Sequence, residues 1–306
     1  MKMMKYPKMN NTYSNKTIDF FRETIPEIDT IKYVITEKIH GANFQVMIED
    51  GKITCATRNR ILENDATFHG FQDVVIPLIA KSLIRNYFDK PVRLFGEFFG
   101  KSIQKGVKYF DEKSIQFFDM TIENNFVSFD NFMITMDQCN LPTVPVINAS
   151  ISLQDAINFD VENFKSVINE DIEGENIAEG IVIKPVRELW VGHDRFVLKK
   201  KSDNFAEKVK RKKPIIEKQV NEVLVKWKNV VAEYVTSNRM DNLFSKIGVI
   251  GSEKEIGKYM AEYMKDVKED VTIDHPELSE EIQLQKDVKY VFNFSKEVLK
   301  MLKVNL

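Results

Sequence analysis

The hydrophobic pattern changes its period near residue 214, and this change limits the possible folds more than any other feature of the sequence. Before it, apolar residues form short strand-like runs at 33–36, 93–98, 114–120, 126–129, 180–184 and 195–199. After it, they recur at three- and four-residue steps from Ile216 to Tyr234, which is the period of an amphipathic helix. We therefore predict an α+β fold with antiparallel sheets in residues 1–213 and a small all-α domain in residues 214–306.

The most sharply defined element of the first part is a hairpin. Residues 44–48 and 52–56 have the composition of strands, and the Asp-Gly pair at 50–51 tolerates the positive φ angles of a two-residue turn. Residues 71–88 have helical apolar spacing, in which Pro77 is expected to kink the helix or to mark its first turn.

In the last third, Ser252 and Glu255 form a capping-box pattern ahead of a helix that starts near Ile256. Pro276 suits the first turn of another helix, and residues 288–302 supply one further apolar stripe. These patterns predict helices throughout this part of the chain.

Composition excludes several classes of protein. The 44 basic and 46 acidic side chains leave a net charge of −2, so a nucleic-acid partner would have to bind a local basic patch.

Cys55 and Cys139 have no paired spacing, and the histidines form no zinc pattern with them, which indicates a reducing compartment. No apolar run reaches the ~18 residues of a membrane helix, and the first residues lack the apolar core of a secretory signal. We expect a cytoplasmic protein with no membrane partner.

A lysine that could act as a nucleophile follows the strand-like run at 33–36. Lys38 opens the segment KIHGAN, in which Gly41 permits the close approach of a ligand. An amine attacks only in its neutral form, so we expect burial or a cluster of cations facing Lys38 to favour that form. The alternative is an exposed lysine beside a turn, which is common for any single lysine.

Two further segments carry groups suited to a nucleotide. Arg58 and Arg60, at the end of the second hairpin strand, have the donor forks that hold phosphates or ribose hydroxyls, although both could be ordinary surface charges. Glu97 follows a glycine within an apolar strand, where its carboxylate needs a hydrogen-bond donor such as a sugar hydroxyl. It could instead lie at the rim of an edge strand.

Two further segments carry groups that could bind a nucleotide. Residues 117–119 contain aromatic rings beside an acid, and residues 179–185 contain an acid and a base. Phe118 could stack on a purine with Asp119 beside it, or it could be a core residue. Glu179 and Lys184 lie at opposite ends of a short apolar strand, where they could hold a divalent cation and a phosphate, or form a structural salt pair.

Three consecutive lysines end the last strand-like run. Alternation along a strand places Lys199 and Lys201 on one face and Lys200 on the other. Two lysines on the same face repel each other unless an anion lies between them, so this pair favours a phosphate site.

In this order and at these spacings, the segments resemble the nucleotidyltransferase motifs of covalent ligases and mRNA capping enzymes. The His-Gly at 40–41, where DNA ligases usually carry Asp-Gly, the following Asn43 and the stretch KSDNFAEK at 201–208 resemble the RNA ligase 2 family. That family includes phage double-strand RNA ligases and trypanosome RNA-editing ligases. The segments SNR at 237–239 and LFSKIG at 243–248 are similar to its C-terminal domain.

The resemblance implies an ATP-grasp-like nucleotidyltransferase domain and an ATP-dependent RNA ligase that repairs RNA in three steps. Lys38 would accept AMP from ATP, the AMP would pass to an RNA 5′-phosphate, and a 3′-hydroxyl would displace it. The implied cofactors are ATP and Mg²⁺ (or Mn²⁺), and the implied partner is nicked duplex RNA, bound by a monomer.

The resemblance also implies the site residues. The catalytic residues would be Lys38, His40, Asn43, Glu179, Lys199 and Lys201, with Glu179 as the metal ligand. ATP would be bound by Glu37, Lys38, Arg58, Glu97, Phe118, Asp119, Lys184, Lys199 and Lys201. RNA would be bound by Asn43, Arg58, Arg60, Lys208, Lys210 and Arg211.

Three alternatives remain open. The first-motif histidine and a helical rather than strand-rich tail argue against a DNA ligase. The same tail argues against a capping enzyme, whose C-terminal domain would be OB-like. A non-catalytic RNA-binding relative would be expected to lose Lys38 or Glu179 first, since neither is needed for folding, and both are present.

Overall fold

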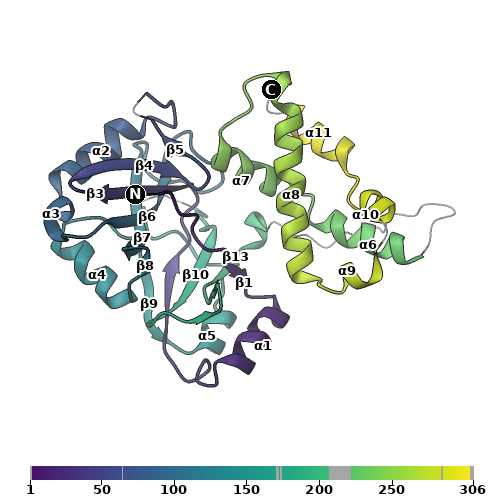
Figure 1. The fold of residues 1–306 in the computed structure, drawn as a ribbon, viewed down its shortest axis with the longest axis horizontal. Helices are drawn as coiled ribbons and strands as arrows, with labels where there is room; N and C mark the ends of the chain where they lie inside the picture. The colour runs from purple at the N-terminus through teal and green to yellow at the C-terminus, as the bar shows by residue number, and fades with distance from the viewer. Residues whose placement is uncertain are drawn as a thin grey trace. The chain divides into compact units, whose positions relative to one another are not determined.

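The computed structural model describes residues 2–63, 65–169, 172, 174–206, 222–283 and 285–303. It divides the chain into two compact units, Met1–Asn204 and Phe205–Leu306 (Figure 1). The predicted boundary between residues 213 and 214 lies outside the described residues.

The first unit contains two largely antiparallel sheets, as predicted. The five-stranded sheet has the order β1 (Asn10–Asn11), β13 (Leu198–Lys201), β10 (Gly180–Pro185), β2 (Tyr33–Glu37) and β9 (Val146–Ile151). The six-stranded sheet has the order β5 (Ile61–Leu62), β4 (Lys52–Thr57), β3 (Ala42–Glu49), β6 (Val92–Phe99), β7 (Ser114–Ile122) and β8 (Asn125–Phe126). The short strands β11 (Trp190–Val191) and β12 (Asp194–Arg195) form a separate hairpin, and β1 runs parallel to β13.

Helices cover one face of each sheet. Helices α1 (Asn15–Thr24) and α5 (Leu153–Asn158) share an apolar core with β2, β10 and β13. Helices α2 (Phe71–Lys81), α3 (Ile84–Tyr87) and α4 (Phe129–Gln138) share another with β3, β6 and β7, and Figure 1 shows them beside that sheet. Because side chains alternate along a strand, the other face of each sheet is left for polar residues.

The predicted hairpin is confirmed. Glu49 pairs with Lys52, and the two turn residues between them have φ angles of 51° and 69°, as a tight primed turn requires. The six-stranded sheet is built outward from this hairpin, since β6 pairs with β3 along nearly its whole length.

Two of the predicted strands differ from the structure. The run at 126–129 is not one strand, because Ser128 accepts a hydrogen bond from the Asn131 backbone and caps α4. The run at 195–199 divides between β12 and β13. The predicted helix at 71–88 is two helices, α2 and α3, and Pro77 lies inside α2.

The second unit is helical where it is described, as predicted. It comprises α6 (Glu222–Glu233), α7 (Ser237–Ile247), α8 (Ile256–Asp274), α9 (Leu278–Glu281), α10 (Gln285–Val291) and α11 (Ser295–Lys303). Trp227, Tyr263 and Val298 are among its fully buried core residues. The capping-box prediction is wrong in detail, since the Glu255 carboxylate accepts from the Gly251 backbone and the helix begins after a 3₁₀ turn.

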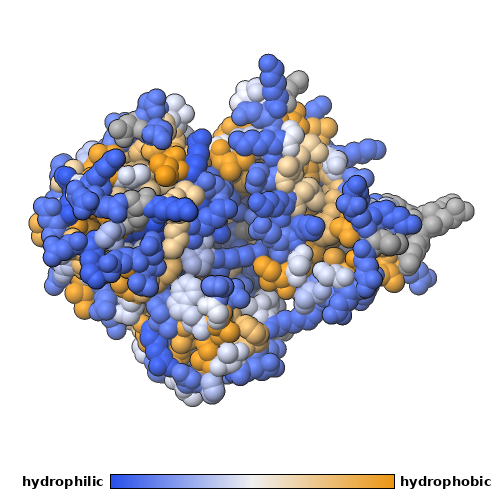
Figure 2. All heavy atoms as spheres, in the orientation of Figure 1, coloured by the Kyte–Doolittle hydropathy of each residue, from blue (hydrophilic) through white to orange (hydrophobic). Residues whose placement is uncertain are grey.

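Hydrophilic side chains predominate on the face that Figure 2 shows, and hydrophobic ones form small, scattered groups among them. Within the described residues, no helix is long and apolar enough to span a bilayer.

Candidate active site

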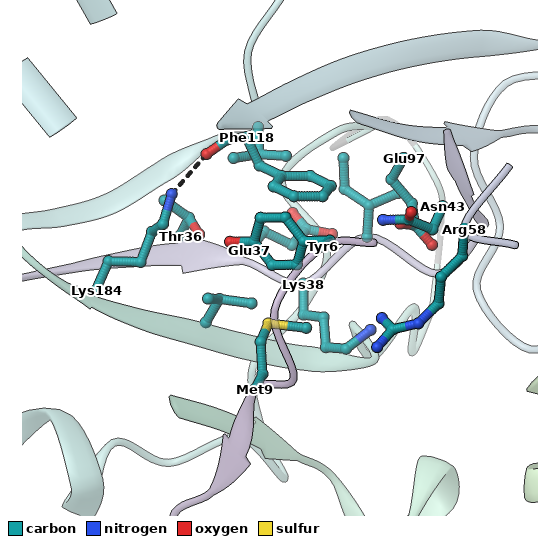
Figure 3. Close-up of a pocket in the computed structure, with 13 residues that line it drawn as sticks. Tyr6, Met9, Thr36, Glu37, Lys38, Asn43, Arg58, Glu97, Phe118 and Lys184 are labelled. Atoms are coloured by element: carbon teal, nitrogen blue, oxygen red, sulfur yellow. Dashed lines mark hydrogen bonds between the residues drawn. The ribbon is translucent and has the colours of Figure 1, made fainter. Parts of the chain in front are cut away.

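A pocket lies between the two sheets of the first unit (Figure 3). It holds about 520 Å³ of space that no protein atom fills, part of which is open to solvent. The lining residues are Tyr6, Met9, Thr36, Glu37, Lys38, Ile39, Asn43, Arg58, Glu97, Phe118, Val144, Val182 and Lys184. Most of the ATP-site residues predicted from the sequence are therefore brought together.

Strand alternation explains which side chains reach this pocket from the five-stranded sheet. On β10, Ile181 and Ile183 pack into the apolar core beneath α1 and α5, so Val182 and Lys184 face the pocket. On β13, the Lys200 amine donates to two backbone carbonyls at the end of α5. The two neighbouring lysines consequently lie on the opposite face, as the sequence predicts.

A carboxylate lies at the centre of the charged residues. Glu179 Oε2 accepts from Lys38 Nζ at 2.9 Å, and Glu179 Oε1 lies 2.8 Å from Lys201 Nζ. The Glu179 side chain is 2% exposed. Burial by itself would raise its pKa, but Lys201 and Lys38 outweigh burial and hold that pKa well below its usual range. Lys38 therefore contacts a buried carboxylate, and Lys201, one of the expected cations, lies at the other oxygen of the same carboxylate.

His40 is fixed at two points. Its Nδ1 lies 3.3 Å from Glu179 Oε2, and its backbone N–H donates to the Tyr109 hydroxyl at 2.7 Å. The next residue is Gly41, where a Cβ atom would come within 2.4 Å of the Phe98 carbonyl oxygen. A glycine is therefore required for β3 to begin so close to β6.

Asn43 and Glu97 are paired residues on neighbouring strands of the six-stranded sheet. Both line the pocket, and Asn43 Oδ1 is buried with no hydrogen-bond partner. Burial raises the pKa of Glu97 to about 7, although Lys38 lowers it in part. Arg58 also lines this side of the pocket, and its guanidinium points toward the same end of the pocket as the Lys38 amine in Figure 3.

A β-bulge in β7 lies beside the pocket. Gly96 pairs with Phe117 and Phe95 pairs with Asp119, which leaves Phe118 as an extra residue on β7. Alternation places Phe118 on the pocket side, opposite Phe117, and the extra residue lets Asp119 also lie away from the core that holds Phe117 and Met120. The ring of Phe118 meets that of Tyr6 edge to face, with 5.1 Å between centroids.

Asp119 does not line the pocket. Its carboxylate accepts from Tyr6 at 2.7 Å and Arg195 at 2.6 Å, and lies 2.8 Å from Lys184 Nζ. Burial raises the pKa of Asp119, but Lys184 and Arg195 outweigh that effect and lower it. The structure thus places Asp119 as a buried anchor that holds Tyr6 and Lys184, two residues of the pocket lining.

Glu37 lines the pocket, and protein groups also bind its carboxylate. Its carboxylate accepts from the Ser166 hydroxyl at 2.6 Å and the Val167 backbone at 2.9 Å, and burial raises its pKa. Arg60 is exposed beyond the end of β4 and does not line the pocket. Lys208, Lys210 and Arg211, predicted to bind RNA, lie outside the described residues.

The sequence matches known proteins over both parts of the chain. Residues 31–201, which contain the whole set of pocket motifs from Lys38 to Lys201, match the family model described as RNA ligase. Residues 217–306 match a second model, T4 RNA ligase 2 C-terminal. This chain belongs to the RNA ligase family. The C-terminal match places it among the RNA ligase 2 members.

Solved structures of an RNA ligase from Naegleria gruberi share the fold of this family member. An apo variant has 19% identity and a TM-score of 0.50, with 66% of this chain and 56% of that chain covered. A variant with ATP and Mn has 18% identity and a TM-score of 0.50, with 67% and 58% covered. The present chain therefore spans less than two thirds of the length of these relatives.

Several pocket residues of this RNA ligase family member were not predicted from the sequence. They are Tyr6, Met9, Thr36, Ile39, Val144 and Val182. Val182 could have been found from strand alternation, since it shares a face with Lys184. Tyr6 and Met9 carry no local signal, because they belong to an N-terminal segment that only the tertiary fold brings to the pocket.

Proposed function

We propose that this chain is an ATP-dependent RNA ligase that seals 3′-hydroxyl and 5′-phosphate ends, preferentially at nicks in duplex RNA. The observation that carries the proposal is the position of Lys38 in the wall of the pocket, where its amine lies 2.9 Å from the buried Glu179 carboxylate, within a family match that covers every pocket motif. The Naegleria gruberi relative solved with ATP and Mn supports the same nucleotide and a divalent metal.

In this proposal ATP lies along the pocket from Phe118 to Lys38. The adenine stacks on Phe118, whose ring lines the pocket. A ribose hydroxyl donates to Glu97, and Arg58 binds the ribose or the phosphates at the nick. Lys184, held between Asp119 and the Phe118 carbonyl, supplies a fixed positive charge on the pocket wall.

The first step transfers AMP to the protein. The Lys38 nitrogen forms a bond to the α-phosphorus as the bond from that phosphorus to pyrophosphate breaks, and the amine loses its protons to solvent or a neighbouring base. Lys199 and Lys201 stabilise the negative charge that develops on the phosphate. Glu179 orients the two lysines that it contacts.

The next two steps join the RNA ends. The 5′-phosphate attacks the same phosphorus, the phosphorus–nitrogen bond breaks, and an AMP-capped strand forms. The 3′-hydroxyl then attacks the capped phosphate, a phosphodiester forms and AMP leaves. Asn43, whose buried Oδ1 is unpartnered, is placed to contact the RNA end during these steps.

The acidic residues present fit a magnesium or manganese ion bound mainly by phosphates. Within the described part of the chain, no group of three or more Asp, Glu, His or Cys side chains forms a metal cage. Mg²⁺ usually takes one or two carboxylates together with substrate phosphates and water, and Glu179 is the carboxylate in reach of the lysine cluster. The ion would neutralise phosphate charge during transfer.

The proposal extends to the setting of the reaction. Both cysteines are unpaired and buried, which supports action in the reducing cytoplasm. We also propose that the ligase acts as a monomer.

The test is the intact mass of the purified protein after incubation with ATP and Mg²⁺. We expect an adduct of one AMP, absent in Lys38→Ala and absent when GTP replaces ATP. No adduct in folded protein that was not already adenylylated would support a non-catalytic RNA-binding relative instead. Labelling by GTP would support a capping enzyme.

Substrate choice is tested by sealing rates on matched nicks. We expect a nick with an RNA 3′-hydroxyl strand to be sealed faster than the same nick in DNA, and faster than free single strands are joined. Equal rates on the DNA nick would support a DNA ligase.

A further inference from the structure

We propose that Tyr109 is a positioning residue for the nucleophile, acting through a hydrogen-bonded brace behind the turn that carries Lys38. The inference rests on the proposed ligase function. Tyr109 lies in the connection between β6 and β7 and does not line the pocket. Its role is therefore distinct from that of the residues that would contact ATP.

The first part of the brace is the contact between Tyr109 and the turn. The Tyr109 hydroxyl accepts from the His40 backbone N–H at 2.7 Å. The ring packs edge to face against Phe99, with 4.9 Å between centroids, and joins an apolar cluster that includes Ile39. Burial raises the pKa of Tyr109 well above its usual range, so its hydroxyl stays neutral. Tyr109 thus contacts both residues that follow Lys38.

The second part of the brace holds Tyr109 itself in place. Asn176, which is 5% exposed, binds the residue before Tyr109 through both ends of its amide. Its Oδ1 accepts from the Lys108 backbone N–H at 2.8 Å, and its Nδ2 donates to the Lys108 carbonyl at 2.8 Å. Asn169 donates to the Tyr109 carbonyl at 3.3 Å.

The third part holds the residue before the nucleophile. The Ser166 backbone donates to the Asn176 carbonyl at 2.9 Å, and the Ser166 hydroxyl donates to Glu37 at 2.6 Å. The brace is therefore a continuous chain of contacts that runs from Glu37 through Ser166 and Asn176 to Tyr109 and His40. It ties together the residues on both sides of Lys38.

This arrangement fixes the backbone on both sides of Lys38, while the Lys38 amine contacts Glu179 and not the brace. The Lys38 backbone donates to the Gly180 carbonyl at 2.9 Å, which secures the start of the turn. Tyr109 secures its end, two residues later. A transfer reaction requires the attacking nitrogen to be placed within a few tenths of an ångström, so loss of one anchor is expected to reduce the rate of attack.

The test is Tyr109→Phe in the full chain, measured by single-turnover adenylylation with ATP and Mg²⁺. The substitution keeps the ring and removes the hydroxyl that holds His40. We expect the maximal rate to fall at least ~10-fold, with the half-saturating ATP concentration changed less than ~2-fold. Sealing of a nicked RNA that already carries AMP on its 5′-phosphate should change less than ~3-fold, because Lys38 forms no bond in that step.

Tyr33→Phe is the matched control. Tyr33 is also a buried tyrosine of the first unit whose hydroxyl binds a backbone group, since it donates to the Ile28 carbonyl at 2.6 Å. Both variants should show comparable decreases in the midpoint of thermal unfolding, and only Tyr109→Phe should show slow adenylylation.

A second variant keeps the test decisive if Tyr109→Phe folds poorly. Asn176→Ala releases the Lys108 backbone, so it should slow adenylylation in the same selective way. In the variant that carries both Tyr109→Phe and Asn176→Ala, the two reductions in adenylylation rate should not add, because both substitutions break the same chain of contacts. Adenylylation within ~2-fold of the wild-type rate in either single variant, or equal slowing of both steps, would overturn the inference. An absent adduct in the wild-type protein would instead contradict the proposed function.

Discussion

Two neighbouring lysines of β13, Lys200 and Lys201, are held by different partners, and this separates their expected roles. Lys201 lies 2.8 Å from the buried Glu179, whereas Lys200 donates to the Ile157 and Phe159 carbonyls on the other face of the sheet. Substitution of Lys201, with Lys200 as the control, therefore tests the proposed role of Lys201 in the site.

We expect Lys201→Ala to lower the adenylylation rate by about 10²-fold, since it removes a cation proposed to stabilise the transferring phosphate. Lys200→Ala should leave that rate within ~3-fold and cost ~1–2 kcal/mol of unfolding free energy through its two lost hydrogen bonds. Initial adenylylation rates and urea unfolding of both variants measure this. A similar loss of rate in the two variants would contradict the assignment.

The raised pKa of Glu97 predicts that the free energy of unfolding depends on pH. Its pKa is about 7 in the folded protein and 4.5 for an ordinary glutamate, so the folded state binds the proton more tightly. The stabilisation from that proton is complete below pH ~4.5 and is lost as the pH rises through about 7. Glu97→Gln, which cannot ionise, should therefore gain stability relative to the wild type at alkaline pH, by up to ~3 kcal/mol.

Urea unfolding at pH 5 and pH 8 in the absence of nucleotide measures this difference. The two proteins should differ little at pH 5, and the variant should be the more stable one at pH 8. A difference that is the same at both pH values would show that Glu97 does not titrate in this range.

At the scale of elements, the packing of β10 against β13 sets the position of Glu179. Gly180 has a φ of +150°, and a Cβ atom there would lie 1.9 Å from the Lys200 carbonyl oxygen. The close approach of these two strands therefore depends on a glycine immediately after the buried Glu179 carboxylate.

We expect Gly180→Ala to lower the unfolding free energy by about 2–4 kcal/mol and to slow adenylylation, because the strands must separate. Gly192→Ala is the control, since Gly192 has a φ of +60° but no atom within 4 Å of its added Cβ. It should cost only ~1 kcal/mol and leave the rate unchanged. Equal losses in the two variants would show that backbone conformation, and not the contact with Lys200, is the cause.

At the scale of the whole molecule, each unit has a core of its own. The apolar clusters of the two sheets contain residues of the first unit, and the helical cluster contains residues of the second. The residues that line the pocket run from Tyr6 to Lys184, all within the first unit. Formation of the AMP adduct should therefore require only the first unit.

A chain that ends after residue 213 should accept AMP from ATP at a rate within ~10-fold of the full chain, because its pocket and cores are retained. Sealing of nicked duplex RNA should fall much further, since we expect the helical unit, which matches the T4 RNA ligase 2 C-terminal model, to help hold the duplex. Adduct mass and nick sealing, measured side by side, distinguish the two effects. Loss of the adduct in a folded truncated protein would show that the helical unit completes the nucleotide site.

Some features of the site could be predicted from the sequence because they depend on local periodicity. Alternation alone placed Lys199 and Lys201 on one face of a strand and Lys200 on the other, and the Asp-Gly pair specified the hairpin. Asp119 shows where this reasoning fails. The same local pattern suits a nucleotide ligand or a buried anchor, and the choice depends on Arg195, far away in the chain.

The sequence by itself determined the α+β class, the change to helices in the last third and the order of the motifs, because period and turn chemistry act over a few residues. Only the tertiary structure decided the register of β6 against β7 that leaves Phe118 as the extra residue of a bulge. It also decided the approach of Tyr6 to the pocket and the contact of Tyr109 with His40. These depend on pairing between segments that are distant in the sequence. Such pairing is set by the packing of the whole unit rather than by any local preference.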